Sequence, residues 1–417
     1  ITNSGIITSA GGEVVLAAGR SVELVDPGTP NLRVEISAPD TQARNLGQIV
    51  ADAGRVGIYA GLIHHSGAIQ ADSAVVGAGG EIVLKATRSA TLEAGSLTTA
   101  NGAQGGSITI QSGDTTLVSG AVQARGEQGQ GGTVQVLGNL VGLTGSASID
   151  ASGQTGGGTV LVGGDYQGGN PEIQNAYRTY FGPEASIRAD AITAGDGGRV
   201  IVWADDATRA YGRISARGGS ESGNGGFVEV SGKGWLDFAA SVDTRAPNGT
   251  TGTLLLDPSD VTISNAVDAL AGGTFSGGIF SGATSNTTNI SWATIDTQLS
   301  GSSVVITTSG SGGSGNITVA DGHTYASANS LSLLAHNNIA SNGAIVNTGS
   351  GAIALYAGWD GSSTATPAVT SGTGDISITR SLQTGGNITL VAGSDITIQP
   401  PNNIPLNIVA GGTFTAN

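Results

Sequence analysis

The chain has 417 residues, 71 of them glycine and none of them cysteine or methionine, and its formal net charge is −15. Without cysteine it has neither a disulfide framework nor a thiolate metal site, and with only 16 Lys and Arg we expect no nucleic-acid partner and no contact with an anionic membrane surface. No run approaches the roughly 18 apolar residues of a membrane span, so we expect no membrane insertion. Because methionine and a signal peptide are both absent, we expect a piece of a longer protein or a processed subunit.

Residues 1–26 predict one coil of a repetitive β structure, with aliphatic residues alternating after Gly12. The pattern breaks at residues 27–46, where three prolines surround the apolar stretch 32–36. Because alternation of apolar and polar residues indicates a strand, we expect this segment to be an excursion that carries a strand of its own.

A fixed repeat dominates residues 54–162. A glycine returns at a constant interval, and aliphatic side chains stand two and four positions after it. The glycines are Gly54, Gly80, Gly106, Gly132 and Gly158. Such a period is typical of a solenoid, in which each repeat buries its apolar face only by stacking on its neighbours.

Each repeat holds two further apolar positions. One is a second predicted strand of the form x-Ile/Val-x-Ala. The other is a shorter apolar segment between the two strands, at Leu92, Leu117 and Leu143. Three short strands in a repeat of about 26 residues predict a three-sided parallel β-helix whose coils stack about 4.8 Å apart. We attribute the many glycines to its corners, where glycine reaches positive φ at no steric cost.

A second break, at residues 164–183, contains Tyr166, Tyr177, Tyr180 and Phe181, and the coils resume from residue 198 to residue 262. The position between the paired aliphatics should be polar on a solvated face. It is nevertheless apolar in several coils, namely at Val15, Val83, Leu161, Ile201 and Leu255. Contiguous exposed apolar surface usually marks an interface. We therefore predict that the excursions at 27–46 and 164–183 fold over this face, with the four aromatic residues covering it, and that Leu161, Ile201 and Leu255 share an interaction surface with them.

Beyond residue 262 the amino-acid composition and the spacing of the apolar residues change. Residues 263–316 are an irregular stretch rich in Gly, Ser and Thr, either a hinge or a continuation of the coils, and we favour the continuation. The pairs Leu331/Leu333, Ile353/Leu355 and Ile376/Ile378 follow at a shorter interval. They predict that residues 317–417 form a slimmer β-solenoid of about 22 residues per coil. We expect it to end near residue 401 with a last strand at 404–408.

Candidate chemistry is sparse. Asp205 and Asp206 with Arg209, Arg213 and Arg217 are the best catalytic or Ca²⁺-binding candidates, since paired carboxylates serve as acid and base or as metal ligands. A turn with outward-facing arginines is a better explanation of these residues than a catalytic or Ca²⁺-binding site. His64 and His65 are adjacent, so they point to opposite faces of a strand, and His323 and His336 are isolated in the sequence. We expect no catalytic residue, no metal site and no cofactor.

Several motifs resemble a known family. They are VGGDYQG at 162–168, RTYFGP at 178–183, GGRVIVWADD at 197–206, GGFVEVSGK at 225–233, VDTRAPNG at 242–249 and GTLLLDP at 252–258. Together they resemble large exoproteins of the filamentous haemagglutinin type, which Gram-negative bacteria export by two-partner secretion, and the resemblance covers residues 1–262. It implies a right-handed β-helix, an outer-membrane two-partner-secretion transporter for the parent protein, and a role in adhesion or extracellular fibres.

The leading hypothesis is therefore a secreted, non-enzymatic structural and adhesive protein on the surface of a Gram-negative bacterium. It would present contacts to a host-cell, bacterial or matrix glycan or protein. Two alternatives stay open: a filament subunit that polymerises by end-to-end stacking of coils, because open coil ends are edge strands, and a β-helical polysaccharide lyase or hydrolase.

Overall fold

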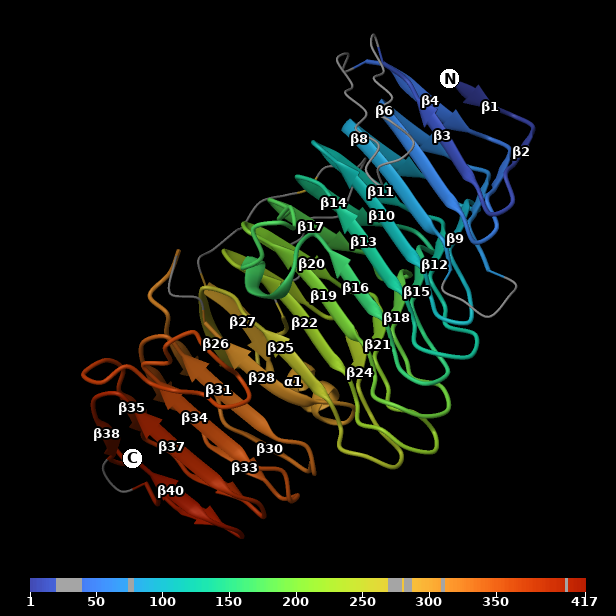
Figure 1. Ribbon diagram of the computed structural model, residues 1–417. Helices are drawn as coiled ribbons and strands as arrows, with labels where there is room; N and C mark the ends of the chain where they lie inside the picture. The colour runs from blue at the N-terminus through green and yellow to red at the C-terminus, as the bar shows by residue number, and fades with distance from the viewer. Residues whose placement is uncertain (20–39, 74–78, 269–279, 281–286, 309–311, 402–403) are drawn as a thin grey trace. The chain divides into compact units, whose positions relative to one another are not determined.

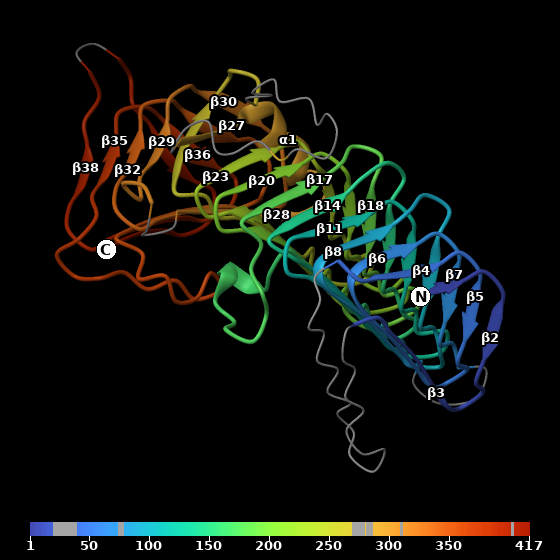
Figure 2. The ribbon, with the colours of Figure 1, turned by 90° about the horizontal axis from the view of Figure 1, so that it is seen from above.

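A computed structural model of the chain describes residues 1–19, 40–73, 79–268, 280, 287–308, 312–401 and 404–417 (Figure 1). The chain forms two compact units. The first comprises Ile1–Trp203, Tyr211–Phe227 and Thr244–Gly252, and the second comprises Ala204–Ala210, Val228–Asp243 and Thr253–Asn417. Each unit consists of short parallel strands stacked coil upon coil, as Figures 1 and 2 show, so the predicted parallel β-helix is confirmed.

The first unit has three faces per coil. The first face contains β3 (Glu13–Ala17), the N-terminal halves of β6 (Arg55–His65) and β8 (Glu81–Leu92), β10 (Ser107–Ser112), β13 (Thr133–Leu137), β16 (Thr159–Val162) and β19 (Arg199–Ala204). The second contains β1 (Thr2–Asn3), β4 (Gln42–Asn45), the C-terminal halves of β6 and β8, β11 (Thr115–Val118), β14 (Leu140–Leu143) and β17 (Arg178–Phe181). The third contains β2 (Ile6–Thr8), β5 (Gln48–Val50), β7 (Ala68–Gln70), β9 (Leu97–Thr99), β12 (Ala121–Gln123), β15 (Ser148–Asp150), β18 (Ser186–Arg188) and β21 (Arg213–Ser215).

The repeated glycines stack directly on one another in the first unit. A Cβ placed on Gly132 would overlap the carbonyl oxygen of Gly106, and a Cβ on Gly106 would overlap that of Gly80. These glycines do not have positive φ. The sequence-based explanation is therefore wrong for them: glycine is required because successive backbones approach too closely for any side chain.

The interior of the second face changes from polar to apolar along the coils. Asn3, Asn45 and His65 occupy equivalent inward positions and are buried. The next coils continue the same stack with Leu92, Val118, Leu143 and Phe181. The inward residue of β11 is therefore Val118 and not the predicted Leu117, because a shift of one residue along a strand exchanges the two faces.

Both predicted excursions end earlier in the chain than expected. Residues 42–45 form β4, which pairs with β1 and β6 as part of the coil, while residues 20–39, including the expected strand at 32–36, lie outside the described residues. The second excursion ends before β17, because Arg178–Phe181 pairs with β14 in the coil.

The second unit begins with β20 (Ala207–Ala210), β22 (Phe227–Gly232), β23 (Trp235–Phe238) and β24 (Ser241–Asp243). One continuing face contains β25 (Thr253–Leu256), β28 (Ser303–Thr307), β31 (Leu331–Ala335), β34 (Ile353–Ala357), β37 (Ile388–Ala392) and β40 (Phe414–Ala416). Another contains β27 (Thr287–Ser291), β26 (Asp260–Ser264), β29 (Ile317–Val319), β32 (Ile339–Ser341), β35 (Ile376–Ile378) and β38 (Ile396–Ile398). A third contains β30 (His323–Tyr325), β33 (Ile345–Asn347), β36 (Leu382–Thr384) and β39 (Ile408–Ala410).

Three sequence-based details of this unit need correction. Ile376 stacks on Ile339, whereas the coil partner of Ile353 is Ile388, so the predicted series joined residues of two faces. The predicted short step holds from Leu331 to Ile353, but the next step, from Ile353 to Ile388, is longer because an excursion follows β34. The last strands are β39 and β40 rather than 404–408.

The stretch 263–316 contains an unpredicted helix, α1 (Trp292–Leu299). Ser291 caps its N-terminus by accepting a hydrogen bond from the backbone N–H of Thr294, which satisfies one of the free donors of the first turn. Gln298 then donates to the carbonyl of Ala240 and accepts from the N–H of Val242. The helix thus covers the edge of β24 and satisfies backbone groups that another strand would otherwise pair.

Candidate functional site

The outer face of the first unit is covered near β16 and β19. Leu161, Ile201 and Trp203 form a buried cluster, with Ile173 and Phe227 packed against it. Ile173 belongs to the excursion that joins β16 to β17, so part of this excursion folds down on the coils. Burying such apolar side chains contributes about 1.5–3 kcal/mol each, which favours a closed excursion.

Asp165 is the polar centre of this excursion. Its carboxylate accepts hydrogen bonds from the backbone N–H of Tyr166 (2.7 Å), from Asn170 Nδ2 (3.0 Å) and from Arg199 Nη2 (2.8 Å). Partial burial of the carboxyl acts to raise its pKa, but these bonds and the Arg199 charge outweigh that effect and lower the pKa of Asp165 below 3.8. The Arg199 guanidinium lies over the Tyr166 ring, which in turn meets Phe227 edge to face.

A second contact ties the excursion to the coils at Gln174. Its Oε1 accepts from Gln111 Nε2 at 2.9 Å, and its Nε2 donates to the carbonyl of Ser112 at 3.2 Å. A cavity of about 310 Å³ opens beside this bridge, with Lys85 and Thr87 also in its wall. The excursion is therefore anchored at both of its halves.

The predicted interaction residues are only partly brought together. Leu161 and Ile201 are in the buried cluster, and Tyr166 lies beside it. Tyr177 is 48% exposed, and Tyr180 packs edge to face on Tyr211 instead of over the cluster.

Phe181 and Leu255 differ further from the expectation. Phe181 points into the coil interior below Leu143, so its expected covering role is wrong. Leu255 belongs to the second unit, where it is buried and pairs with Val305 of β28.

Sequence reasoning missed Trp203, Ile173 and Phe227. Trp203 stands two residues after Ile201 on β19, so the same period-two rule places it on the outer face. Ile173 follows no such rule, because it lies in an irregular segment whose position depends on tertiary packing.

For the candidate catalytic residues, the expected turn with outward-facing arginines is found only in part: Asp205 and Asp206 lie between β19 and β20, and Arg213 and Arg217 are exposed, but Arg209 is not. Arg209 is buried, its guanidinium lies over the Trp235 ring, and its Nε is 4.0 Å from Asp237 Oδ2. His65 is buried in the stack of the first unit, with its ring nitrogens 3.2 Å from Asn45 Nδ2 and from the carbonyl of Leu97. Among the residues that the structure describes, no group of three His, Asp or Glu could hold a metal ion.

His323 takes part in an aromatic stack of the second unit. Its ring lies 5.4 Å from that of Trp292 on α1, and Tyr325 lies beside both. Burial, with a smaller contribution from Asp296, raises the pKa of Tyr325 far above its usual 10.0. Tyr325 is therefore a neutral packing residue at physiological pH.

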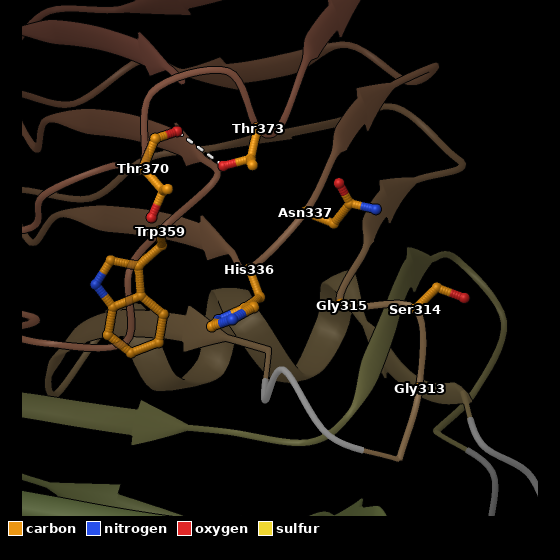
Figure 3. A pocket seen from close by; sticks show the side chains of 8 residues that line it. All are labelled: Gly313, Ser314, Gly315, His336, Asn337, Trp359, Thr370 and Thr373. Carbon is orange, nitrogen blue, oxygen red and sulfur yellow. Dashed lines mark hydrogen bonds between the residues drawn. The ribbon is translucent and has the colours of Figure 1, made fainter. Parts of the chain in front are cut away.

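An open cavity of about 390 Å³ lies in the second unit, between the start of β29, the end of β31 and the excursion that follows β34 (Figure 3). Its wall contains Gly313, Ser314, Gly315, His336, Asn337, Trp359, Thr370 and Thr373. Figure 3 shows the His336 imidazole directed toward the Trp359 indole, with Asn337 and Ser314 on the other side. Trp359 is held by a pair with Val369 in an antiparallel bridge across the excursion. Sequence reasoning treated His336 as isolated and did not predict this cavity.

No protein-family model matches the chain, and no curated protein matches it significantly. Among solved structures, the chain is similar to the HMW1 secretion domain from Haemophilus influenzae, with 31% identity and a TM-score of 0.45. The match covers 61% of this chain and 60% of that one, so the chain spans about three fifths of its length. It does not single out the filamentous haemagglutinin type, and that family remains a prediction. Within the described residues, no helix is long and apolar enough to cross a bilayer.

Proposed function

We propose that the chain is an exported, non-catalytic β-helix that forms a structural and adhesive part of a bacterial cell-surface fibre. The observation that carries the proposal is the way the second excursion packs on the coils. It packs down on the outer face of the coils through Ile173 and the Asp165–Arg199 pair instead of framing a groove of opposed carboxylates.

The stacked coils supply the mechanical part of this function. A strand inside the stack, such as β13 between β10 and β16, pairs with the coils before and after it, so a pulling force along the stack is shared among many backbone hydrogen bonds. The excursions and the loops outside the glycine corners are not part of this hydrogen-bonded framework. Such loops are where binding residues are usually found on rigid scaffolds.

The partners follow from the same proposal. We infer that the exposed loops contact a glycan or protein on host cells, on other bacteria or in a matrix, and that a two-partner-secretion transporter exports the parent protein across the outer membrane. The motifs at 162–168 and 197–206, which resemble those of filamentous haemagglutinin-type exoproteins, support this inference.

Beads coated with the purified chain test the adhesive function. Coated beads should attach to cultured epithelial cells or to a matrix-coated surface several times more than beads coated with albumin. Equal attachment of chain-coated and albumin-coated beads would contradict the proposal. Electron microscopy of the same material provides a second readout: long uniform filaments formed without a partner would favour the self-assembling subunit instead.

A further inference from the structure

Asparagine followed by glycine is a dipeptide in which the side chain and the backbone react readily with each other. The glycine nitrogen attacks the carboxamide carbon of the asparagine, and glycine has no side chain to hinder the approach. The chain contains four such dipeptides, and their asparagines are Asn101, Asn224, Asn248 and Asn342. All four lie among the described residues, so the hydrogen bonds of the coils distinguish the glycine nitrogens that are held from those that are available.

Three of the four glycine nitrogens are held by the coil stack, because each N–H donates to a backbone carbonyl of a neighbouring coil. These bonds run from Gly102 to Arg125 (3.1 Å), from Gly225 to Thr250 (2.8 Å) and from Gly343 to Val319 (2.9 Å). A bonded nitrogen must leave its partner before it turns toward a side chain, so local opening of the coil limits its reaction. Asn224 and Asn342 are exposed, so their protection depends on the following glycine and not on burial of the asparagine.

The dipeptide of Asn248 and Gly249 differs from the other three. Among the residues that the structure describes, the Gly249 N–H has no hydrogen-bond partner. Pro247, Asn248 and Gly249 lie in the corner between β24 and β25, and all three are exposed. The reacting nitrogen is therefore available without any opening of the coils.

Asn248 also connects its corner to the coil before it. Its Nδ2 donates to the carbonyl of Ser220 at 2.7 Å. A Cβ placed on Gly249 would lie 2.1 Å from the carbonyl oxygen of Gly223, so the two corners also touch backbone to backbone. A carboxylate in place of the carboxamide has no N–H to donate to Ser220. An additional backbone methylene would not fit so close a contact.

We propose that Asn248 is a self-modification site, at which the folded chain deamidates in water and thereby loosens the contact between residues 218–224 and 246–250. The Gly249 nitrogen loses its proton and bonds to Cγ of Asn248, the Cγ–Nδ2 bond breaks, and ammonia leaves with that proton. Water then opens the five-membered imide. Cleavage at Cγ gives aspartate, and cleavage at the main-chain carbonyl gives isoaspartate, which has the additional backbone methylene. No atom is oxidised or reduced, and the proposal does not depend on the adhesive function.

Peptide mass spectrometry of the full chain, incubated for increasing times in mildly alkaline buffer, tests the proposal. In the folded chain Asn248 should deamidate about tenfold faster than the other three asparagines, because each of those must first lose a hydrogen bond of its glycine. In the urea-unfolded chain, where no coil holds the glycines, the four rates should be similar. Equal rates in the folded chain, or a reaction at the exposed Asn342 as fast as at Asn248, would overturn the proposal.

Asn248→Asp tests the loosening separately, because it reproduces the charge of one product. Amide hydrogen exchange over residues 218–224 should be about fivefold faster in this variant, the effect of one lost hydrogen bond. Asn342→Asp is the matched control at another exposed asparagine, and it should leave exchange over residues 218–224 unchanged. If exchange in Asn248→Asp equals that of the wild type, deamidation does not loosen the corner and this part of the proposal is wrong.

Discussion

The long corner series is of a different kind in each unit, although a short series of side-chain bonds also joins Asp72, Asn101 and Arg125 in the first unit. In the first unit the corner is a stack of glycines, whose backbones touch with no space for a Cβ. In the second unit the residue at the start of one face carries a side-chain oxygen that accepts from the backbone N–H of its equivalent in the next coil. The series is Asp260, Asn316, Asn338, Asp375 and Asp395.

This difference shows that one architecture can be specified either by steric exclusion or by polar side-chain bonds. The glycine stack tolerates no side chain at all, because the carbonyl of the preceding coil occupies its space. Both series tolerate coils of different length: the side-chain steps from Asn316 to Asn338 and from Asn338 to Asp375 are 22 and 37 residues, and Gly198 stacks on Gly158 across 40 residues. The two corners should therefore respond to mutation with effects of different size.

Gly132→Ala should give the largest effect. The added methyl would overlap the carbonyl of Gly106 and force two coils apart, which we expect to cost about 3 kcal/mol or more. Urea unfolding followed by circular dichroism measures it. Gly5→Ala is the matched control, because a Cβ there meets nothing within 4 Å. Equal midpoints for the two variants would contradict the steric account of the glycine stack.

The buried His65 gives a pH-dependent test of the interior of the first unit. Burial lowers the pKa of His65 below 6.5, so the folded protein binds this proton less readily than the unfolded chain. The stabilising difference is complete above about pH 6.5 and is lost as the pH falls through the folded pKa, at about 1.4 kcal/mol per pKa unit.

Unfolding midpoints at pH 7.5 and pH 5 measure this difference. His65→Gln keeps a donor and an acceptor for Asn45 and Leu97 but cannot titrate, so its midpoint should change less between the two pH values. An unchanged pH dependence in this variant would assign the effect to other groups.

Asn338→Ala should have a moderate effect on the second unit. It removes the acceptor for the N–H of Asp375, a hydrogen bond of 2.8 Å, and should cost about 1 kcal/mol. Asn338→Asp, which keeps the acceptor, should retain most of the stability. If alanine and aspartate have the same unfolding midpoint, the side-chain series does not hold the coils together.

Asp165→Asn should have the smallest effect, confined to the second excursion. Because Arg199 is partly exposed, the lost ion pair should cost a few tenths to about 1 kcal/mol. Since the folded pKa of Asp165 is lowered, its contribution is present above about pH 3.8 and disappears as the pH falls through the folded value. Amide hydrogen exchange over residues 163–177 should be faster in the variant, with rates in β13 unchanged; unchanged rates in the excursion would contradict the anchoring role of Asp165.

The sequence predicted the architecture well wherever the glycines recur at a constant interval. The paired aliphatics after each glycine stack in the expected register, for example Ile108 on Ile82 and Val134 on Ile108. The candidate sites were predicted less well. Phe181 was expected on the surface but lies inside, and the cavity around Trp359 draws its wall from three segments that are far apart in the chain.

The sequence by itself thus determined the parallel β-helix, because burial of alternating aliphatics and close contact of glycine backbones are local requirements that recur in every coil. Only the tertiary structure decided which residues of the excursions pack on the coils, where α1 covers the edge of β24, and how His336, Asn337 and Trp359 come together. The reason is physical. Stacking depends on a short pattern that repeats, whereas these features depend on single contacts between residues of no fixed spacing, and their positions are set by the coils on which they fold.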